Sequence, residues 1–265
     1  IAALRVAMVA GCLGSFLLIR NLALIGDGLA HVSFGAIAIG LIVGIVDALY
    51  WAFAICVIAA ILINYLQVKQ WLTGDTAIAI FLTGMLGLGI VVTRIWGGGS
   101  LISVEGYLWG NLNLIDSDSF EFIMISCFLS YLSLVALYQS LLLISIDPIA
   151  ARIQGLPVRF IGLYWSILTA AVVVSMVQFV GVLLVTALIV TPAAIAQLIS
   201  RSFLMCVIYS QLIGIITVLL GLYYSAELST DSGAMIALVS AIMFVIVAIS
   251  KGLLRKLNAS SNNSN

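Results

Sequence analysis

Long apolar runs separated by short polar connections are the feature that most restricts what this chain can fold into. About nine such runs are recognised with a window of roughly 19 residues. They cover residues 1–19, 22–46, 48–68, 76–93, 120–146, 160–179, 182–199, 203–224 and 233–249. Lipid offers the backbone no hydrogen-bond partners, so runs of this length favour helices. We therefore expect an all-α, polytopic membrane protein with about eight to nine transmembrane helices, the lower count applying if one helix is broken near Gly181.

Composition agrees with this class. Hydrophobic residues make up 64% of the 265 residues and charged residues 8%, whereas soluble proteins average about 25% charged residues. Basic and acidic residues balance at ten each, so no nucleic-acid partner is expected. The four cysteines have no paired spacing and are typical of small core residues. The chain opens in apolar sequence without Met, so we expect that an upstream piece is missing.

Basic residues predict the orientation. Most of them fall on one side of the predicted helices, which the positive-inside rule makes cytoplasmic. These residues are Arg20, Lys69, Arg152, Arg159, Arg201, Lys251, Arg255 and Lys256. Residues 1–250 are expected to form a single transmembrane domain, and residues 251–265 a short cytoplasmic tail.

Asp27 and the only histidine of the chain, His31, lie inside the second run. In a helix, a spacing of four residues places both side chains on one face. An ionisable residue in a membrane span costs about 2.5 to 3.5 kcal/mol and normally faces the protein interior or water. If the helix starts at Arg20, His31 lies roughly 16 Å into the span, near the bilayer midplane. A carboxylate and an imidazole suit zinc, manganese or iron. A buried pair that serves only helix packing is the alternative.

The cytoplasmic connection 145–162 predicts a short surface helix. Asp147 can cap it, Pro148 suits its first turn, and Gly155 with Pro157 can end it. Such a helix could dock a soluble partner, or it could be only a capped turn. The side chains available for docking would be Ala150, Ala151 and Ile153.

Thr191 and Pro192 lie within the seventh run. Proline removes a backbone hydrogen bond and kinks a helix, and transporters bend at such breaks around their pathway. Gln178 supplies a polar group nearby, although a lone glutamine more often bridges two helices.

Glu227 and Asp231 are four residues apart near the predicted exterior. On one helix they could receive a cation, which makes Glu227 a candidate metal ligand. Asp231 is more typical of a cap at the start of the last helix.

Five motifs together resemble the zinc/manganese permease family of ATP-binding-cassette (ABC) importers. They are LIGDGLAHVSFGAIAIG (24–40), GDTAI (74–78), LWGN (108–111), Asp147-Pro148 with Gly155, and VGVLLVTALIVTPAAIAQ (180–197). They occur in the family's order over almost the whole chain. The sequence departs from members that carry additional histidines in the pathway.

The resemblance implies a homodimeric permease in the bacterial plasma membrane. Its central pathway would be lined by Asp27 and His31 and would pass Zn²⁺ or Mn²⁺ without retaining it. A cytoplasmic ATPase would bind ATP on each half, and an extracytoplasmic metal-binding protein would deliver the ion. The coupling region that docks the ATPase would include Asp147, Ala150, Ala151 and Gly155. The His-Val-Ser-Phe-Gly sequence after Ala30 resembles the zinc branch, so zinc is the expected cargo.

Three alternatives stay open. Manganese or iron could be the cargo in place of zinc. Because no Gly-x-x-x-x-Gly-Lys-Ser/Thr motif occurs in the chain, energy must come from another chain or from an ion gradient, and Asp27 with His31 could relay protons in a secondary transporter. An intramembrane metalloenzyme is a poor fit, because catalytic zinc usually has three protein ligands. We therefore expect a transporter subunit rather than an enzyme.

Overall fold

The computed structural model describes residues 2–44, 48–96 and 117–262, and a helix occupies every predicted apolar run within these ranges. The described residues contain no strand, so the predicted all-α architecture is confirmed. In chain order the helices are α1 (Ala2–Ile19), α2 (Ile25–Val43), α3 (Ala48–Val68), α4 (Gly74–Trp96), α6 (Ser117–Ala136), α7 (Tyr138–Ile146), α8 (Pro148–Ile153), α9 (Val158–Val180), the 3-10 turn η2 (Val182–Leu184), α10 (Val185–Ile199), α11 (Phe203–Leu228) and α12 (Ser232–Asn262).

Six of the described helices are long and apolar enough to cross a membrane, and the bent pair α6–α7 would make a seventh span. Two more apolar helices, α1 and α10, are shorter. The predicted eight to nine helices correspond to these spans plus the two shorter helices. Helix α12 also continues through Lys251 to Asn262, beyond the end that hydropathy indicates.

Hydropathy predicted a single helix over the run 120–146. The structure shows that this run is not one straight helix. It bends by 69° between α6 and α7, at Leu137. After the bend, the Tyr138 ring lies 5.8 Å from the Phe203 ring and 5.9 Å from the Phe16 ring, centroid to centroid. These aromatic contacts join α7 to α1 and α11. Both arms of the bend are equally apolar, so hydropathy gives no sign of it.

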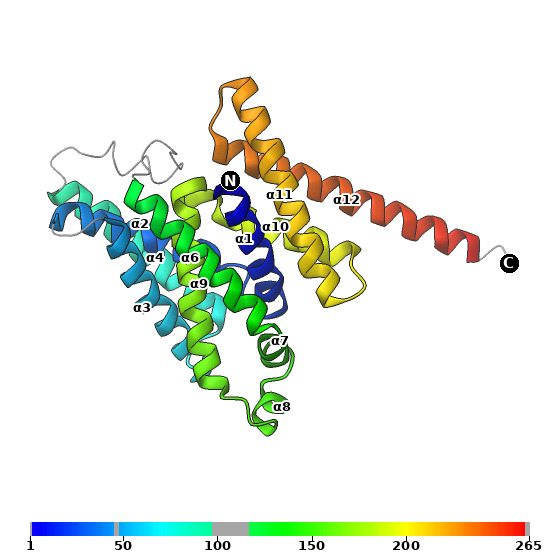
Figure 1. Cartoon of the computed structure of the whole chain (residues 1–265), viewed down its shortest axis with the longest axis horizontal. Helices are drawn as coiled ribbons and strands as arrows, with labels where there is room; N and C mark the ends of the chain where they lie inside the picture. The colour runs from blue at the N-terminus through cyan, green and yellow to red at the C-terminus, as the bar shows by residue number, and fades with distance from the viewer. Residues whose placement is uncertain (1, 45–47, 97–116, 263–265) are drawn as a thin grey trace.

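Helix α2 lies at the centre of the bundle and α12 at its edge. In the most apolar stretch of each helix, 78% of the α2 residues are buried but only 17% of the α12 residues. Helix α2 packs mainly against α3 and α4, and also against α9, whereas α1 packs against α10 and α11. Figure 1 shows α12 extending away from the other helices.

Glycines allow α4 to approach α2 closely. A Cβ atom on Gly35 would lie 2.5 Å from the carbonyl oxygen of Met85, and a Cβ atom on Gly28 would lie 2.5 Å from Cγ2 of Ile78. Only glycine, which has no side chain, fits at these distances. Small residues bring membrane helices together in this way. This close contact fixes the position of the helix that carries Asp27 and His31.

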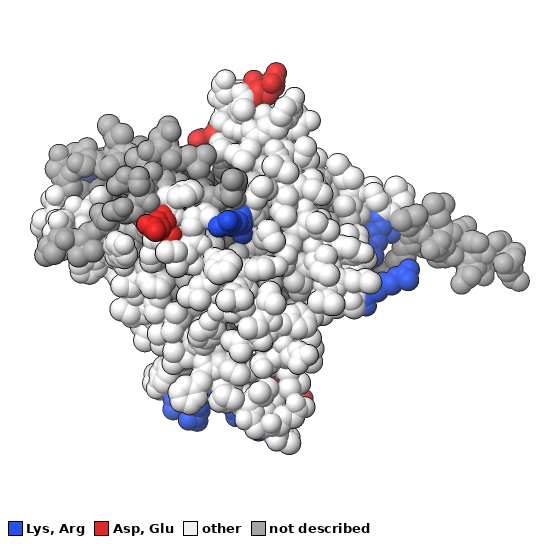
Figure 2. Space-filling model, in the orientation of Figure 1, with Lys and Arg blue, Asp and Glu red and all other residues white. Residues whose placement is uncertain are grey.

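The charged side chains are unevenly distributed over the surface. In Figure 2, acidic groups lie where α11 meets α12, while basic groups gather at the opposite end, near α8, and along α12. Basic and acidic groups are also visible elsewhere in this view. This distribution agrees with the cytoplasmic side that the positive-inside rule predicts.

Candidate functional site

Helix α2 begins later than the sequence indicated. Arg20 and Asn21 form a turn after α1, Asn21 has a φ of 54°, and the helix starts at Ile25. Asp27 is therefore in the first helical turn, and His31 lies roughly 9 Å along the axis from the start of the helix. An unbroken helix from Arg20 is therefore not present, and the depth of His31 in the bilayer stays a prediction. In the first turn, the helix dipole also stabilises the Asp27 carboxylate.

The two side chains face each other without a hydrogen bond between them. His31 Nε2 lies 3.7 Å from Asp27 Oδ1, which is longer than a hydrogen bond. The other ring nitrogen, Nδ1, is buried and has no hydrogen-bond partner. The side chain of His31 is 10% exposed and that of Asp27 is 30% exposed. A packing pair should satisfy its own polar atoms, so this geometry disfavours the packing alternative.

This pair can hold part of the coordination shell of one metal ion. Metal–ligand distances to histidine nitrogen and carboxylate oxygen are about 2.0 to 2.2 Å, so one ion can contact two atoms 3.7 Å apart. Among the described residues, no group of three or more His, Cys, Asp or Glu side chains could hold a metal ion. One chain thus offers two strong ligands, which fits an ion in transit better than a closed structural site with four protein ligands.

The start of α10 lies beside Gly26, the residue before Asp27, and the sequence did not predict this contact. A Cβ atom on Gly26 would lie 3.2 Å from Ile189 Cδ1 and 3.9 Å from the methyl carbon of Thr186. Thr186 is half-buried and carries the hydroxyl group of this part of α10. The sequence signal for this contact is Thr186, which follows Gly181, the glycine between two apolar runs.

The predicted break at Thr191 and Pro192 is not present. Helix α10 continues through Pro192. The chain does break at Gly181, where the sequence allowed a broken helix, and the φ of 84° there suits glycine. A Cβ atom on Gly214 would lie 3.9 Å from Cβ of the buried Pro192, so the proline packs against α11. Gln178 is buried in the last turns of α9, before the break. A pathway role for Gln178 stays a prediction.

Glu227 and Asp231 do not share a helix. Helix α11 ends at Leu228, Ser229 has a φ of 50°, and Asp231 immediately precedes α12. Glu227 is exposed near the end of α11. Since no three-ligand group occurs in the described part of the chain, Glu227 does not complete the Asp27–His31 pair within one chain.

The short surface helix is present as the sequence predicted. Asp147 Oδ1 accepts hydrogen bonds from the backbone N–H groups of Ile149 at 2.8 Å and Ala150 at 3.0 Å. Gly155 follows the helix with a φ of 82°. These contacts define α8 as a capped helix of six residues.

The docking side chains predicted on α8 need one correction. Ala151 is fully buried against its own chain, so it is not available to a partner, and Ala150 is half-buried. Ile153, which the sequence also predicted, is 83% exposed, and Ile149, which it did not predict, is 70% exposed. They lie one helical turn apart and form an apolar ridge at the end of the molecule.

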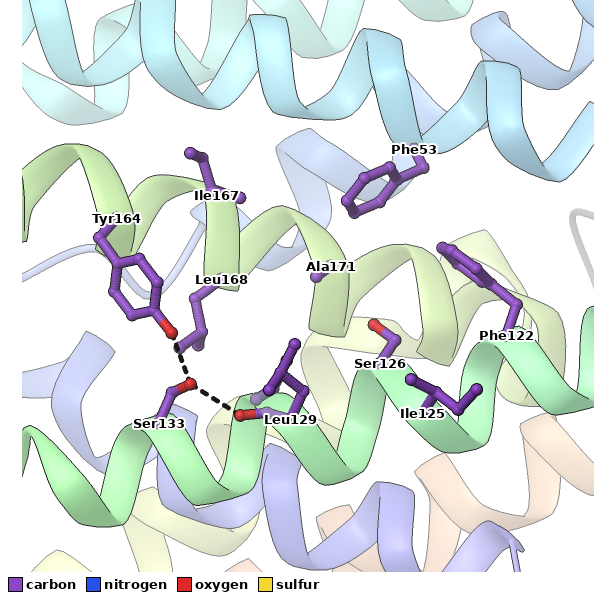
Figure 3. Close-up of a pocket in the computed structure, with 11 residues that line it drawn as sticks. Phe53, Phe122, Ile125, Ser126, Leu129, Ser133, Tyr164, Ile167, Leu168 and Ala171 are labelled. Atoms are coloured by element: carbon purple, nitrogen blue, oxygen red, sulfur yellow. Dashed lines mark hydrogen bonds between the residues drawn. The ribbon is translucent and has the colours of Figure 1, made fainter.

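An apolar cavity of about 280 Å³ lies between α3, α6 and α9. Figure 3 shows Tyr164 and Ser133 at one end of it, where the tyrosine hydroxyl donates to Ser133 Oγ and Ser133 Oγ donates to the carbonyl oxygen of Leu129. None of its lining residues is Asp, Glu, His or Cys. This cavity therefore lacks the ligands that a divalent ion needs, and it is not the candidate site.

The helical spans define a multi-pass membrane protein, and the most buried of them carries the acid–imidazole pair. The chain belongs to the ABC 3 transport family, which matches residues 1–251. The predicted membership of the zinc/manganese permease family is thereby confirmed, and the chain is a membrane subunit of an ABC-type metal importer.

Relatives of known name cover most of the chain. The manganese transport system membrane protein MntC of Listeria monocytogenes is 32% identical over 248 residues, covering 93% of this chain and 87% of the relative. The manganese import system permease protein ScaB of Streptococcus parasanguinis is 31% identical over 247 residues, with the same coverage.

Solved structures share the fold. PsaBC from Streptococcus pneumoniae, in complex with Fab, has a TM-score of 0.81 and 29% identity, covering 93% of this chain and 88% of that one. A putative metal-chelate type ABC transporter in an inward-facing conformation has a TM-score of 0.66 at 19% identity, which shows the fold alone.

Proposed function

We propose that this chain is the permease subunit of an ATP-driven importer whose cargo is Mn²⁺. The observation that carries the proposal is the Asp27–His31 pair, in which a buried imidazole nitrogen lacks a partner and the facing atoms stand 3.7 Å apart. The names of the relatives favour manganese over the zinc that the His-Val-Ser-Phe-Gly sequence suggested. Carboxylate oxygen with imidazole nitrogen is compatible with either ion.

A second copy of the chain would complete the site. Asp27 is partly exposed on the surface of one chain, and a carboxylate in a membrane helix that faced lipid would cost free energy. A symmetric homodimer that places two Asp27–His31 pairs around one axis removes this cost and supplies four ligands. The ion passes between the pairs, and water completes its shell.

Energy enters through other chains. The sequence contains no Gly-x-x-x-x-Gly-Lys-Ser/Thr motif, so ATP is bound and hydrolysed by a cytoplasmic ATPase subunit that docks on α8. An extracytoplasmic metal-binding protein delivers the ion at the opposite side of the bacterial plasma membrane. In this arrangement residues 1–250 are the permease domain and residues 251–265 are the cytoplasmic tail.

Metal-resolved uptake tests the cargo. In vesicles that carry the whole complex, we expect ATP-dependent Mn²⁺ uptake to exceed Zn²⁺ uptake by about tenfold. Zinc should compete all the same, because N/O sites bind it more tightly than manganese and a tightly held ion leaves slowly. Faster transport of zinc than of manganese would contradict the cargo assignment. Uptake that persists without the ATPase and collapses with the proton gradient would instead indicate a secondary transporter.

The apolar ridge of α8 gives a separate prediction. Ile149→Ser and Ile153→Ser should together weaken docking of the ATPase by at least about tenfold, because each removes a large exposed apolar contact worth about 1 kcal/mol or more. Co-purification of the ATPase with the permease measures the effect. Leu204→Ser is the matched control, since Leu204 is an exposed apolar residue at the start of α11. Equal recovery of the ATPase with both forms would refute docking through this ridge.

A further inference from the structure

A polar cavity of about 360 Å³ lies between the start of α2, the end of α3, the α7–α8 connection and α9. It is separate from the Asp27–His31 pair, neither of which lines it. Its polar lining includes Arg20, Asn21, Asn64, Gln67, Ser145 and Ser166. No acidic residue lines it, so its only formal charge is the positive charge of Arg20.

Trp165 gives this cavity an unused hydrogen-bond donor. The residue lines the cavity and is 3% exposed, and its indole Nε1–H is buried with no hydrogen-bond acceptor among the residues that the structure describes. Leaving such a group unpaired costs about 1 to 3 kcal/mol. Native proteins pair nearly all buried polar groups, so an orphaned donor beside a cavity indicates a missing acceptor.

Arg20 lies against the same indole and also lacks an acidic partner. Its guanidinium carbon is 5.3 Å from the centre of the Trp165 ring, and no carboxylate within the described ranges lies within ion-pair distance of it. Partial burial lowers the pKa of Arg20 from its usual value through desolvation, although the group stays charged at neutral pH. Burial of the Arg20 charge is therefore unfavourable, and a bound anion would offset this loss of free energy.

The amides of Asn64 and Gln67 provide further donors. Both residues line the cavity, and the Gln67 amide nitrogen also lies against Gly74 at the start of α4. The Asn64 amide lies near Gly162 of α9, where a Cβ atom on the glycine would be 3.9 Å from Nδ2. Donors from the α1–α2 turn, α3 and α9 therefore surround one space.

We propose that this cavity binds the phosphate group of an anionic ligand, held by Arg20, Trp165, Asn64 and Gln67. A guanidinium group matches phosphate oxygens with two parallel hydrogen bonds, and the indole and the amides donate the others. A divalent cation would be repelled by Arg20 and would find no carboxylate. The group could belong to a lipid headgroup at the membrane boundary or to a free phosphate. When bound, it bridges the α1–α2 turn to α3 and α9.

Binding of simple phosphates to the purified full chain in detergent tests this site. The probes are dioctanoyl phosphatidylglycerol, dioctanoylglycerol, which has the same acyl chains without phosphate, and potassium phosphate. Native mass spectrometry should show one phosphate-bearing ligand per chain. Trp165→Phe, which keeps an aromatic ring but removes the N–H, should weaken binding about tenfold, and Arg20→Gln should weaken it further. Arg159→Gln, which removes an exposed charge outside the cavity, should not change it.

The outcomes separate the two sources and the alternatives. Binding of phosphatidylglycerol alone assigns a lipid headgroup, whereas binding of potassium phosphate as well assigns a soluble anion. Equal binding of dioctanoylglycerol and phosphatidylglycerol would overturn the proposal, as would wild-type affinity in Trp165→Phe. Trp165→Phe decides the matter if Arg20→Gln does not fold, and a thermal melt checks each variant. Because binding is measured without transport, the result does not depend on whether the chain carries manganese.

Discussion

Manganese uptake should fall by at least about tenfold when Asp27 is replaced by Asn or His31 by Gln, a loss that corresponds to about 1.4 kcal/mol or more. Asp27→Asn removes the charge of the oxygen ligand and keeps its shape. His31→Gln removes the imidazole and keeps a polar side chain of similar length. With only two strong ligands per chain among the described residues, neither loss can be compensated locally. The measurement is ATP-dependent uptake in vesicles at matched protein levels.

Glu121→Gln is the matched control for this experiment. Glu121 is an exposed acid on α6, and the same change of charge there should leave uptake unaltered. Both site variants should still assemble with their partners, because the pair makes no hydrogen bond that holds helices together. Normal uptake by Asp27→Asn and by His31→Gln, with normal assembly, would show that the pair does not line the transport pathway.

Gly35→Ala should lower the stability of the folded chain by about 1 to 3 kcal/mol, the usual cost of overpacking a tight contact. The added Cβ atom would lie 2.5 Å from the backbone oxygen of Met85, so α4 has to move away from α2. The apparent Tm in detergent, compared at one heating rate because such unfolding is often irreversible, measures the change. The same displacement should also reduce uptake, since α4 holds α2 in place.

Gly84→Ala, also at a glycine of the α2–α4 pair, should not lower stability, in contrast to Gly35→Ala. A Cβ atom on Gly84 of α4 has no other atom within 4 Å. Alanine is a better helix former than glycine by about 1 kcal/mol, so this change should leave the Tm unaltered or raise it. A fall of equal size in both variants would contradict the proposal that contact between α2 and α4 at Gly35 decides the effect.

The helices and the surface helix α8 could be predicted because their signals are local. Apolar runs of membrane length specify helices through backbone hydrogen bonding alone. Asp147, Pro148 and Gly155 specify α8 because a cap, a fixed φ and a left-handed residue act on their own backbone. The spacing of Asp27 and His31 likewise places them on one face wherever the helix begins.

Contacts between helices could not be predicted in the same way. Helix α2 is apolar on all sides, so its pattern does not say that α10 lies beside Gly26 or that Pro192 faces α11. The bend at Leu137 follows from aromatic packing between segments far apart in sequence. Burial of Ala151 depends on the same kind of tertiary contact. The late start of α2 also had no strong local signal, because Asn21 adopts its left-handed turn without glycine or proline.

The stiffness of α8 has a mechanical consequence. It is a six-residue element held by its cap at Asp147 and by the left-handed Gly155, and it contacts both α7 and α9. A helix of six residues that is held at both ends does not bend when a partner displaces it. A force applied to Ile149 and Ile153 would therefore act on α7, against which α8 packs most, and on α9, which packs against α3 and α2. A small movement at the rim of the molecule would in this way turn the helix that carries the imidazole.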